Sequence, residues 1–164
     1  MRGWEDAPFY FNHVAGQIFH VTSTEGFTAI IGDREIRANR GEREFTFHQS
    51  SFSFAKRMGY VALFDFRNCS DEKIAMMAHV WRCLVAKHQP AILLVFDPAK
   101  VSTSLITSQS AALDFANAEF MKNNYHVPLV EAWVAERIPL SFCTSVLEIT
   151  WSPESVDRIQ LSEI

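Results

Sequence analysis

The sequence predicts an α+β fold with a mainly antiparallel sheet. Short segments at 43–48, 50–55 and 59–66 alternate aromatic or aliphatic residues with polar ones, which is the period of half-buried strands. A segment at 70–89 instead has apolar residues three and four positions apart, as an amphipathic helix requires. The chain of 164 residues has an ordinary apolar share of 48% and no repeat or linker, so we expect one domain spanning residues 1–164.

The first elements are a strand and a helix that follow one another directly. Residues 18–22 (IFHVT) form the predicted strand, and Ser23 or Thr24 can cap the helix after it. We expect Gly32 and Asp33 to end this helix. A short return strand is then predicted at 35–38 (EIRA).

The middle of the chain adds strands around the long predicted helix. The three alternating segments are followed by the helix at 70–89, which Ser70 can cap and Pro90 ends. The apolar run AILLVF at 91–96 is predicted to be a buried strand.

The last third is predicted to return to the sheet. We expect a polar loop at 101–110, an amphipathic helix at 110–123 and a strand at 128–138. Pro139 is predicted to open a one-turn helix that reaches Ser145, and a strand at 146–151 closes the sheet. Ser152 and Pro153 mark the start of a C-terminal helix.

Composition excludes several functional classes. The net charge of −4 argues against a broad nucleic-acid-binding face, and the glycine-rich motifs of phosphate-binding loops are missing. The three cysteines are far apart and the six histidines form no ligand pair, so we expect free thiols and no metal site. The N-terminus lacks a secretion signal, and the longest apolar run, at 91–96, is too short to span a bilayer. We therefore expect a cytoplasmic protein without membrane contact.

Two polar residues lie at predicted strand positions that an apolar core residue could also occupy. His20 lies in a strand next to Thr22, directly before a helix begins. Glu131 lies in an otherwise apolar strand, where a carboxylate costs free energy unless something uses it, and Trp133 shares its face. The simpler alternatives are a hydrogen-bonded core histidine and a Glu131 that pairs with Arg137 or with a lysine on an edge strand.

Three segments in order resemble the signature motifs of the ADP-ribosyltransferase superfamily, especially its toxin-like bacterial branches. The first is FHVTSTEGFTAIIGDREIRA at 19–38, and the second is SSFSFAKRMGYVALFDF at 50–66. The third, VEAWVAERIPLSFCTSVLEI at 130–149, has a glutamate eight residues before a proline, as in the DNA-modifying toxins of this superfamily. The resemblance implies an ADP-ribosyltransferase-like fold with a split, mainly antiparallel sheet flanked by helices.

The resemblance also implies NAD as the substrate. Cleavage of the nicotinamide–ribose bond passes through an oxocarbenium-like state, which a carboxylate stabilises, and Glu131 is the residue in that place. By the same resemblance His20 binds the adenosine-side ribose, with the Val21 backbone on the carboxamide and Thr22 beside it. Ser51, Phe52 and Phe54 would hold the nicotinamide ring, and Trp133 would line the site, although both phenylalanines could equally be core residues. The arginine of the family remains open between Arg37, Arg40 and Arg57.

The implied activity is that of an NAD-dependent ADP-ribosyltransferase or NAD glycohydrolase. It would transfer ADP-ribose to a macromolecule of unknown class or to water, as a bacterial toxin or defence protein with a neutralising protein partner. The alternative is a catalytically silent domain of the same fold that acts in protein–protein interaction. The catalytic interpretation requires that His20 and Glu131 project into one cleft.

Overall fold

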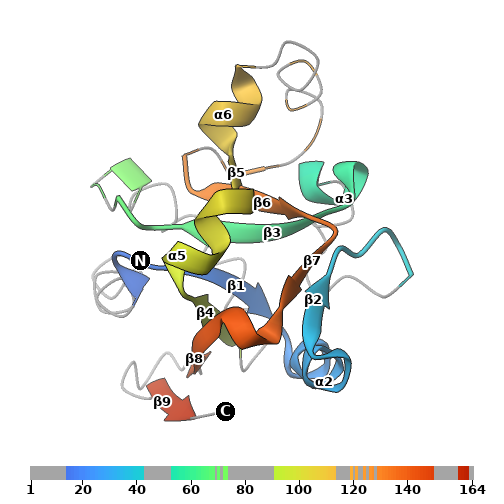
Figure 1. Ribbon diagram of the computed structural model, residues 1–164, viewed down its shortest axis with the longest axis vertical. Coiled ribbons are helices and arrows are strands. Elements are labelled where there is room, and N and C mark those ends of the chain that lie inside the picture. The colour runs from blue at the N-terminus through green and yellow to red at the C-terminus, as the bar shows by residue number, and fades with distance from the viewer. Residues whose placement is uncertain are drawn as a thin grey trace, which may run out of the picture.

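The computed structural model of the chain describes residues 14–42, 53–68, 70, 72–73, 91–113, 119, 121, 124, 126–127, 129–149 and 159–162. Its centre is a seven-stranded sheet, and each strand pair within the described ranges is antiparallel (Figure 1). The spatial order is β5 (Ile106–Thr107), β6 (Glu131–Ala135), β3 (Tyr60–Asp65), β1 (Ile18–Thr22), β4 (Ala91–Phe96), β8 (Cys143–Ile149) and β9 (Ile159–Ser162). A second sheet pairs β2 (Glu35–Arg37) with β7 (Arg137–Pro139), also antiparallel.

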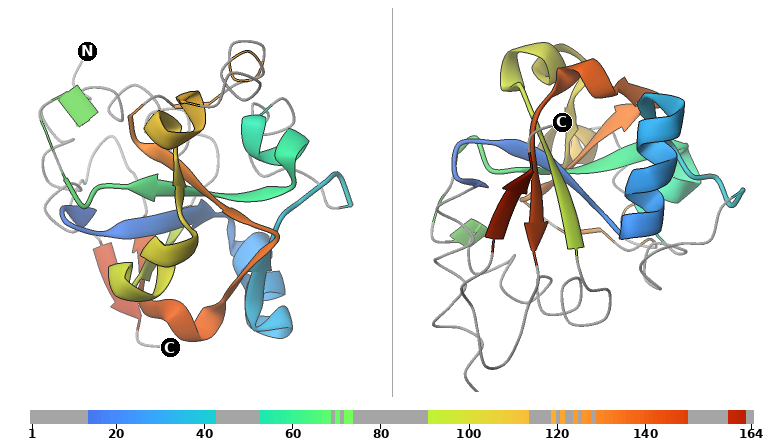
Figure 2. Two further views of the ribbon diagram at one scale, coloured as in Figure 1. Left: turned by 45° about the horizontal axis from the view of Figure 1, so that its top comes forward. Right: turned by 90° about the horizontal axis from the view of Figure 1, so that it is seen from below.

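Short helices surround the sheet, which confirms the predicted α+β class. They are α2 (Thr24–Asp33), α3 (Phe54–Met58), α5 (Pro98–Val101) and α6 (Ser108–Ala112), with the 3₁₀ turns η2 (Ser102–Ser104) and η3 (Leu140–Phe142). Both views in Figure 2 show α2 beside the β2–β7 pair, at the end of the sheet where β1 ends and leads into α2. In the described ranges, no helix has the length and hydrophobicity that crossing a bilayer requires.

The junction of β1 and α2 follows the sequence prediction. Ser23 is the N-cap, and its hydroxyl accepts a hydrogen bond from the Gly26 N–H at 3.1 Å. A Cβ on Gly26 would lie 2.1 Å from Thr22 Oγ1, so the close approach of strand and helix requires glycine there. The helix ends at Asp33, and Arg34 follows with a left-handed φ of 57°.

The predicted strand at 50–55 is wrong for its last two residues. Ser53 caps α3 instead, because its hydroxyl accepts from the Lys56 N–H at 3.2 Å. Gly59 ends the helix at a φ of 68°, and β3 begins at the next residue. Residues 50–52 and the predicted strand at 43–48 lie outside the described residues.

The predicted strand at 128–138 is two strands in two sheets. Glu136 adopts a left-handed φ of 64° between β6 and β7, which breaks the extended chain and sends β7 to pair with β2. The predicted one-turn helix after Pro139 is confirmed as η3, but it is shorter than expected. β8 therefore begins at Cys143, three residues before the strand predicted at 146–151.

Other expectations are met only in part. The segment 101–110 is not an open loop, since the end of α5, η2, β5 and the start of α6 occupy it. The predicted helix at 110–123 is described as helical at 110–112, 119 and 121, and the one at 70–89 only at 72–73. The predicted helix start at 152–153 lies outside the described residues.

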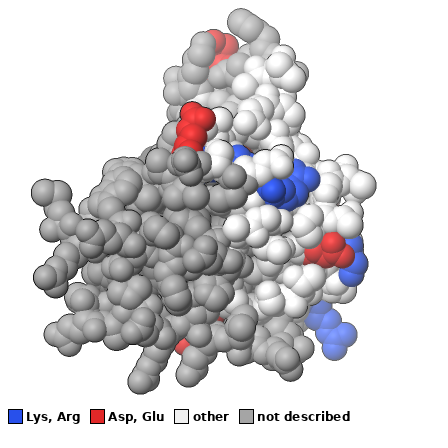
Figure 3. All heavy atoms as spheres, turned by 90° about the vertical axis from the view of Figure 1, so that its left-hand side faces the viewer, with Lys and Arg blue, Asp and Glu red and all other residues white. Residues whose placement is uncertain are grey.

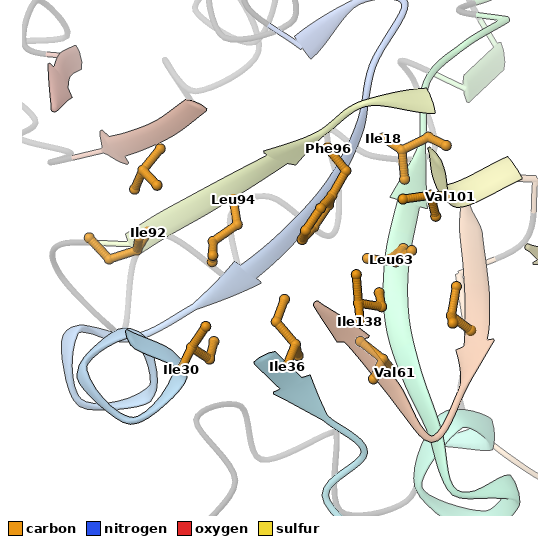
Figure 4. Close-up of a cluster of buried hydrophobic side chains, with 12 residues drawn as sticks. Ile18, Ile30, Ile36, Val61, Leu63, Ile92, Leu94, Phe96, Val101 and Ile138 are labelled. Atoms are coloured by element: carbon orange, nitrogen blue, oxygen red, sulfur yellow. The ribbon is translucent and has the colours of Figure 1, made fainter. Parts of the chain in front are cut away.

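The two faces of the large sheet bury different sets of side chains. On one face, which we call the Ile18 face, α2, the β2–β7 pair and α5 contribute to a cluster that includes Ile30, Ile36, Leu63, Leu94, Val101, Val134 and Ile138 (Figure 4). On the opposite face, the Trp133 face, Trp133 packs with Phe54, Ala55, Ala111 and Met121. Strand alternation thus separates a mostly aliphatic cluster, which also holds Phe96, from a cluster centred on Trp133 and Phe54.

The sheet opens between β1 and β3. These strands pair only at Ile18–Asp65 and Phe19–Phe64, whereas all five residues of β1 pair with β4. Beyond Phe19 the two strands diverge, β1 toward α2 and β3 toward α3 (Figure 1). The opening therefore lies beside His20, Val21 and Thr22.

Candidate functional site

The carboxylate of Glu131 is buried and held by two hydrogen bonds. Its Oε1 accepts from Trp133 Nε1 at 2.8 Å, and its Oε2 accepts from the Val127 N–H at 2.7 Å. The side chain is only 6% exposed. The Glu131 N–H in turn donates to the Val127 carbonyl at 2.9 Å, so residue 127 contacts both the backbone and the side chain of Glu131. This excludes the alternative pairing with Arg137, whose guanidinium contacts Glu35 at 3.7 Å.

Aromatic rings surround the Trp133 indole, which donates the hydrogen bond to Glu131 Oε1. The indole of Trp133 is fully buried, and the Phe54 ring packs against it at 4.6 Å between centroids. The half-buried ring of His126 lies edge-on to the indole at 6.3 Å. The cluster of Phe54, His126, Glu131 and Trp133, which we call the Trp133 cluster, joins residues of α3, β6 and the chain before β6.

Burial dominates the electrostatics of this carboxylate. Removal from water raises the pKa of Glu131 to about 7, and the bonds from Val127 and Trp133 act in the opposite direction. The group therefore changes its charge near neutral pH. Such a displaced pKa is typical of functional carboxylates, although buried structural ones have it as well.

His20 is fixed through one nitrogen. Its Nδ1 lies 2.8 Å from the carbonyl oxygen of Ala62, across the opening between β1 and β3. A carbonyl only accepts, so Nδ1 carries the proton and donates. Burial lowers the pKa of His20, while the bond to Ala62 acts against this. The imidazole is therefore neutral at pH 7, and its Nε2 is an acceptor.

Strand register separates the two predicted catalytic residues. Phe19 pairs with Phe64 and Phe64 pairs with Glu131, so these three side chains project from one face of the sheet. His20 follows Phe19 and pairs with Leu94 of the Ile18 face. Alternation therefore directs Glu131 and Trp133 to the Trp133 face, and His20 to the Ile18 face. The structure brings Glu131, Trp133 and Phe54 together. It does not bring His20 to them, so the requirement that His20 and Glu131 project into one cleft is not met.

The neighbours of His20 have local structural roles. Val21 and Thr22 are each 6% exposed, and they project to opposite faces. The Thr22 hydroxyl lies against Gly26 in the first turn of α2. Ser51 and Phe52, predicted to hold the nicotinamide ring, lie outside the described residues.

The three candidate arginines are all exposed. Arg37 pairs with Glu35 at 2.6 Å on the small sheet. A Cβ on Gly59 would lie 2.6 Å from Nε of Arg40, so the Arg40 guanidinium covers the C-terminal end of α3. Arg57 lies on α3 itself. The choice between these three for the arginine that the resemblance implies therefore stays open.

Charges do not gather by sign on the surface that can be seen. On the described part of the face in Figure 3, acidic and basic side chains are scattered among uncharged ones. Among the described residues, no three histidine, cysteine, aspartate or glutamate side chains lie together as a metal site would require.

Sequence reasoning missed Val127 and His126. The bond from the Val127 N–H to Glu131 comes from a backbone group, which no residue type signals. His126 lies five positions before Glu131, and only the folded chain brings its ring against Trp133. No protein family, curated protein or solved structure that was compared with this chain matches it.

Proposed function

We propose that this chain binds NAD and cleaves the nicotinamide–ribose bond, with Glu131 as the carboxylate that stabilises the developing positive charge. The observation that carries the proposal is the geometry of Glu131. Each carboxylate oxygen accepts one hydrogen bond, from Trp133 or Val127, and a carboxylate oxygen can accept two. The orientation is set within the protein. Among the described residues neither oxygen accepts a further hydrogen bond, so each has an acceptor position that a ribose hydroxyl would use.

The surroundings of Glu131 suit a cationic transition state. A buried carboxylate interacts more strongly with a nearby positive charge than one in water does. The nicotinamide ring of NAD is itself cationic, so its binding would lower the pKa of Glu131 and favour the charged carboxylate. A pKa of about 7 in the ligand-free protein is compatible with that step.

His20 would serve the other end of the ligand. Its Nδ1–H is occupied by Ala62, so Nε2 is the atom that would accept a ribose hydroxyl. His20 and Glu131 project from opposite faces of the sheet, so this role is separate from the reaction that the proposal assigns to Glu131, and a His20→Ala variant tests it by itself. The acceptor of the ADP-ribose is a macromolecule or water.

The alternative function is a catalytically silent domain of the same fold that acts in protein–protein interaction. The low exposure of Glu131 and the opposite faces of His20 and Glu131 favour it. Under this alternative the Glu131 bonds to Trp133 and Val127 only stabilise the turn before β6.

The test is release of nicotinamide from NAD by the purified chain, alone and with DNA, RNA or a protein mixture added. We expect release in at least one of these conditions, and its loss in Glu131→Gln. The matched control is Glu148→Gln, which removes the same charge from an exposed position on β8 and should leave release unchanged. His20→Ala should weaken NAD binding, measured by calorimetry.

The outcomes separate the two functions. Nicotinamide release that persists in Glu131→Gln would show that the reaction does not require this carboxylate. A wild-type chain that neither binds NAD nor releases nicotinamide would contradict the proposed activity and favour the silent domain instead.

A further inference from the structure

The Trp133 indole makes the only side-chain hydrogen bond to Glu131 in the described part of the chain. The bond joins Nε1 to Oε1 at 2.8 Å between two residues on the same face of β6. Both side chains are buried, at 0% and 6% exposed, so water does not compete freely for either partner. A bond from a neutral donor to a charged acceptor is among the stronger kinds in proteins.

The indole itself has little freedom to move. Phe54 packs on it at 4.6 Å between centroids, Tyr60 packs against Phe54 at 6.2 Å, and the His126 ring lies edge-on to it at 6.3 Å. A ring fixed on several sides presents its N–H in one direction, which preorganises the bond to Glu131.

The backbone before β6 is also fixed in an unusual conformation. Leu129 has a left-handed φ of 68°, which costs a non-glycine residue on the order of 1 kcal/mol or more. The turn persists because the Glu131 N–H bonds the Val127 carbonyl and the Val127 N–H bonds Oε2. The two hydrogen bonds between Val127 and Glu131 thus offset part of the conformational cost at Leu129.

We propose that Trp133 is the positioning residue of the Glu131 carboxylate: its N–H sets the direction of Oε1, and Phe54 transmits the position of α3 to the indole. This assignment rests on the proposed function for its catalytic meaning, while the bond itself can be tested without any turnover. The role differs from the expectation that Trp133 only lines the ligand site, because a positioning residue acts on the ligand through Glu131.

The assignment has a direct chemical consequence. The indole N–H stabilises the charged carboxylate more than the neutral acid, so its removal makes Glu131 harder to ionise. The other titratable groups of the described residues at this cluster are His126, against the indole, and Tyr60, against Phe54. A titration has to distinguish these from Glu131.

The experiment compares Trp133→Phe with wild type. Phenylalanine keeps an aromatic ring against Phe54 but lacks the N–H donor. We expect the carboxyl ¹³C resonance of Glu131, measured in the ligand-free protein, to titrate about one to two pH units higher in the variant. Nicotinamide release at pH 7 should fall about tenfold through kcat and recover as the pH rises. The control Phe54→Leu disturbs the packing and keeps the donor, so it should lower thermal stability with a smaller change in the titration.

A second measurement applies even where Trp133→Phe folds poorly. In the intact chain one of the four tryptophan indole N–H signals should move with the Glu131 titration, and it should stop moving in Glu131→Gln. An indole signal that is independent of Glu131, or a Glu131 titration unchanged in Trp133→Phe, would overturn the assignment. A confirmed titration in a chain without NAD turnover would refute the proposed function and the positioning role for it, and leave the bond standing.

Discussion

The buried Glu131 carboxylate should make this protein less stable as the pH rises through neutrality. We expect the free energy of unfolding to fall when the pH is raised from 5 to 8. The pKa of Glu131 is about 7 in the folded chain against 4.5 for an ordinary glutamate. Between these values the folded state holds a proton that the unfolded state has released, so stability falls with pH.

The magnitude follows from the same two values. Integrating the linkage relation for one group with pKa values of 4.5 and about 7 gives a loss of about 2 to 3 kcal/mol between pH 5 and pH 8. This stabilisation is fully present below pH 4.5 and is lost as the pH passes 7. It is a large share of the stability of a typical domain.

His20 contributes with the opposite sign. Its pKa is lowered by burial, so the unfolded state holds more protons than the folded one below pH 6.5. Its contribution is therefore present above pH 6.5 and is lost as the pH falls. Wild type alone would show the sum of both effects.

The assay removes this overlap by comparison with Glu131→Gln. Urea denaturation of both proteins at pH 5, 6, 7 and 8 yields two stability curves, and their difference isolates the glutamate. Glutamine fills the same volume and does not titrate, while His20 is present in both. A difference that is constant from pH 5 to 8 would refute the reasoning, because it would mean that Glu131 has an ordinary pKa.

Three further predictions concern the elements around the site. Gly26→Ala should destabilise the chain by about 1–3 kcal/mol because its Cβ would meet the Thr22 hydroxyl, and Thr22→Ala should relieve part of that loss in a double-mutant cycle of denaturation midpoints. His20→Ala should lose about 1–3 kcal/mol, since it leaves the Ala62 carbonyl without its donor; equal stability in urea would show that the ring is dispensable. Asp65→Asn should lose a similar amount at pH 7, because the Arg67 guanidinium donates two hydrogen bonds to the Asp65 carboxylate at 2.9 and 2.8 Å. Burial raises the pKa of Asp65, but these bonds outweigh it and hold the pKa below 3.8, so the difference from wild type should disappear in a pH series of urea denaturations as the pH falls below that value.

The local elements could be predicted from the sequence because neighbouring residues decide them. The serine that caps α2, the alternation in β3 and the apolar run of β4 act over a few positions, and the structure confirms each of them. Pro139 likewise predicts η3. The same local logic could have found α3, since Ser53 and Gly59 are a capping serine and a terminating glycine. The alternating phenylalanines before it favoured a strand instead.

The site depended on contacts that no local pattern encodes. A left-handed Glu136 divides one predicted strand between two sheets, and only pairing shows which face each half takes. The position of His20 depends on the carbonyl of Ala62, 42 residues away, where the ladder between β1 and β3 ends.

The sequence by itself therefore determined the residue types, the order of most elements and the presence of a carboxylate in an apolar strand. Tertiary structure alone decided that this carboxylate meets an indole and a backbone N–H, and that His20 starts from the other face of the sheet. The physical reason is register. A shift of one residue between strands exchanges the faces of every side chain, and register is set by long-range packing rather than by neighbouring residues.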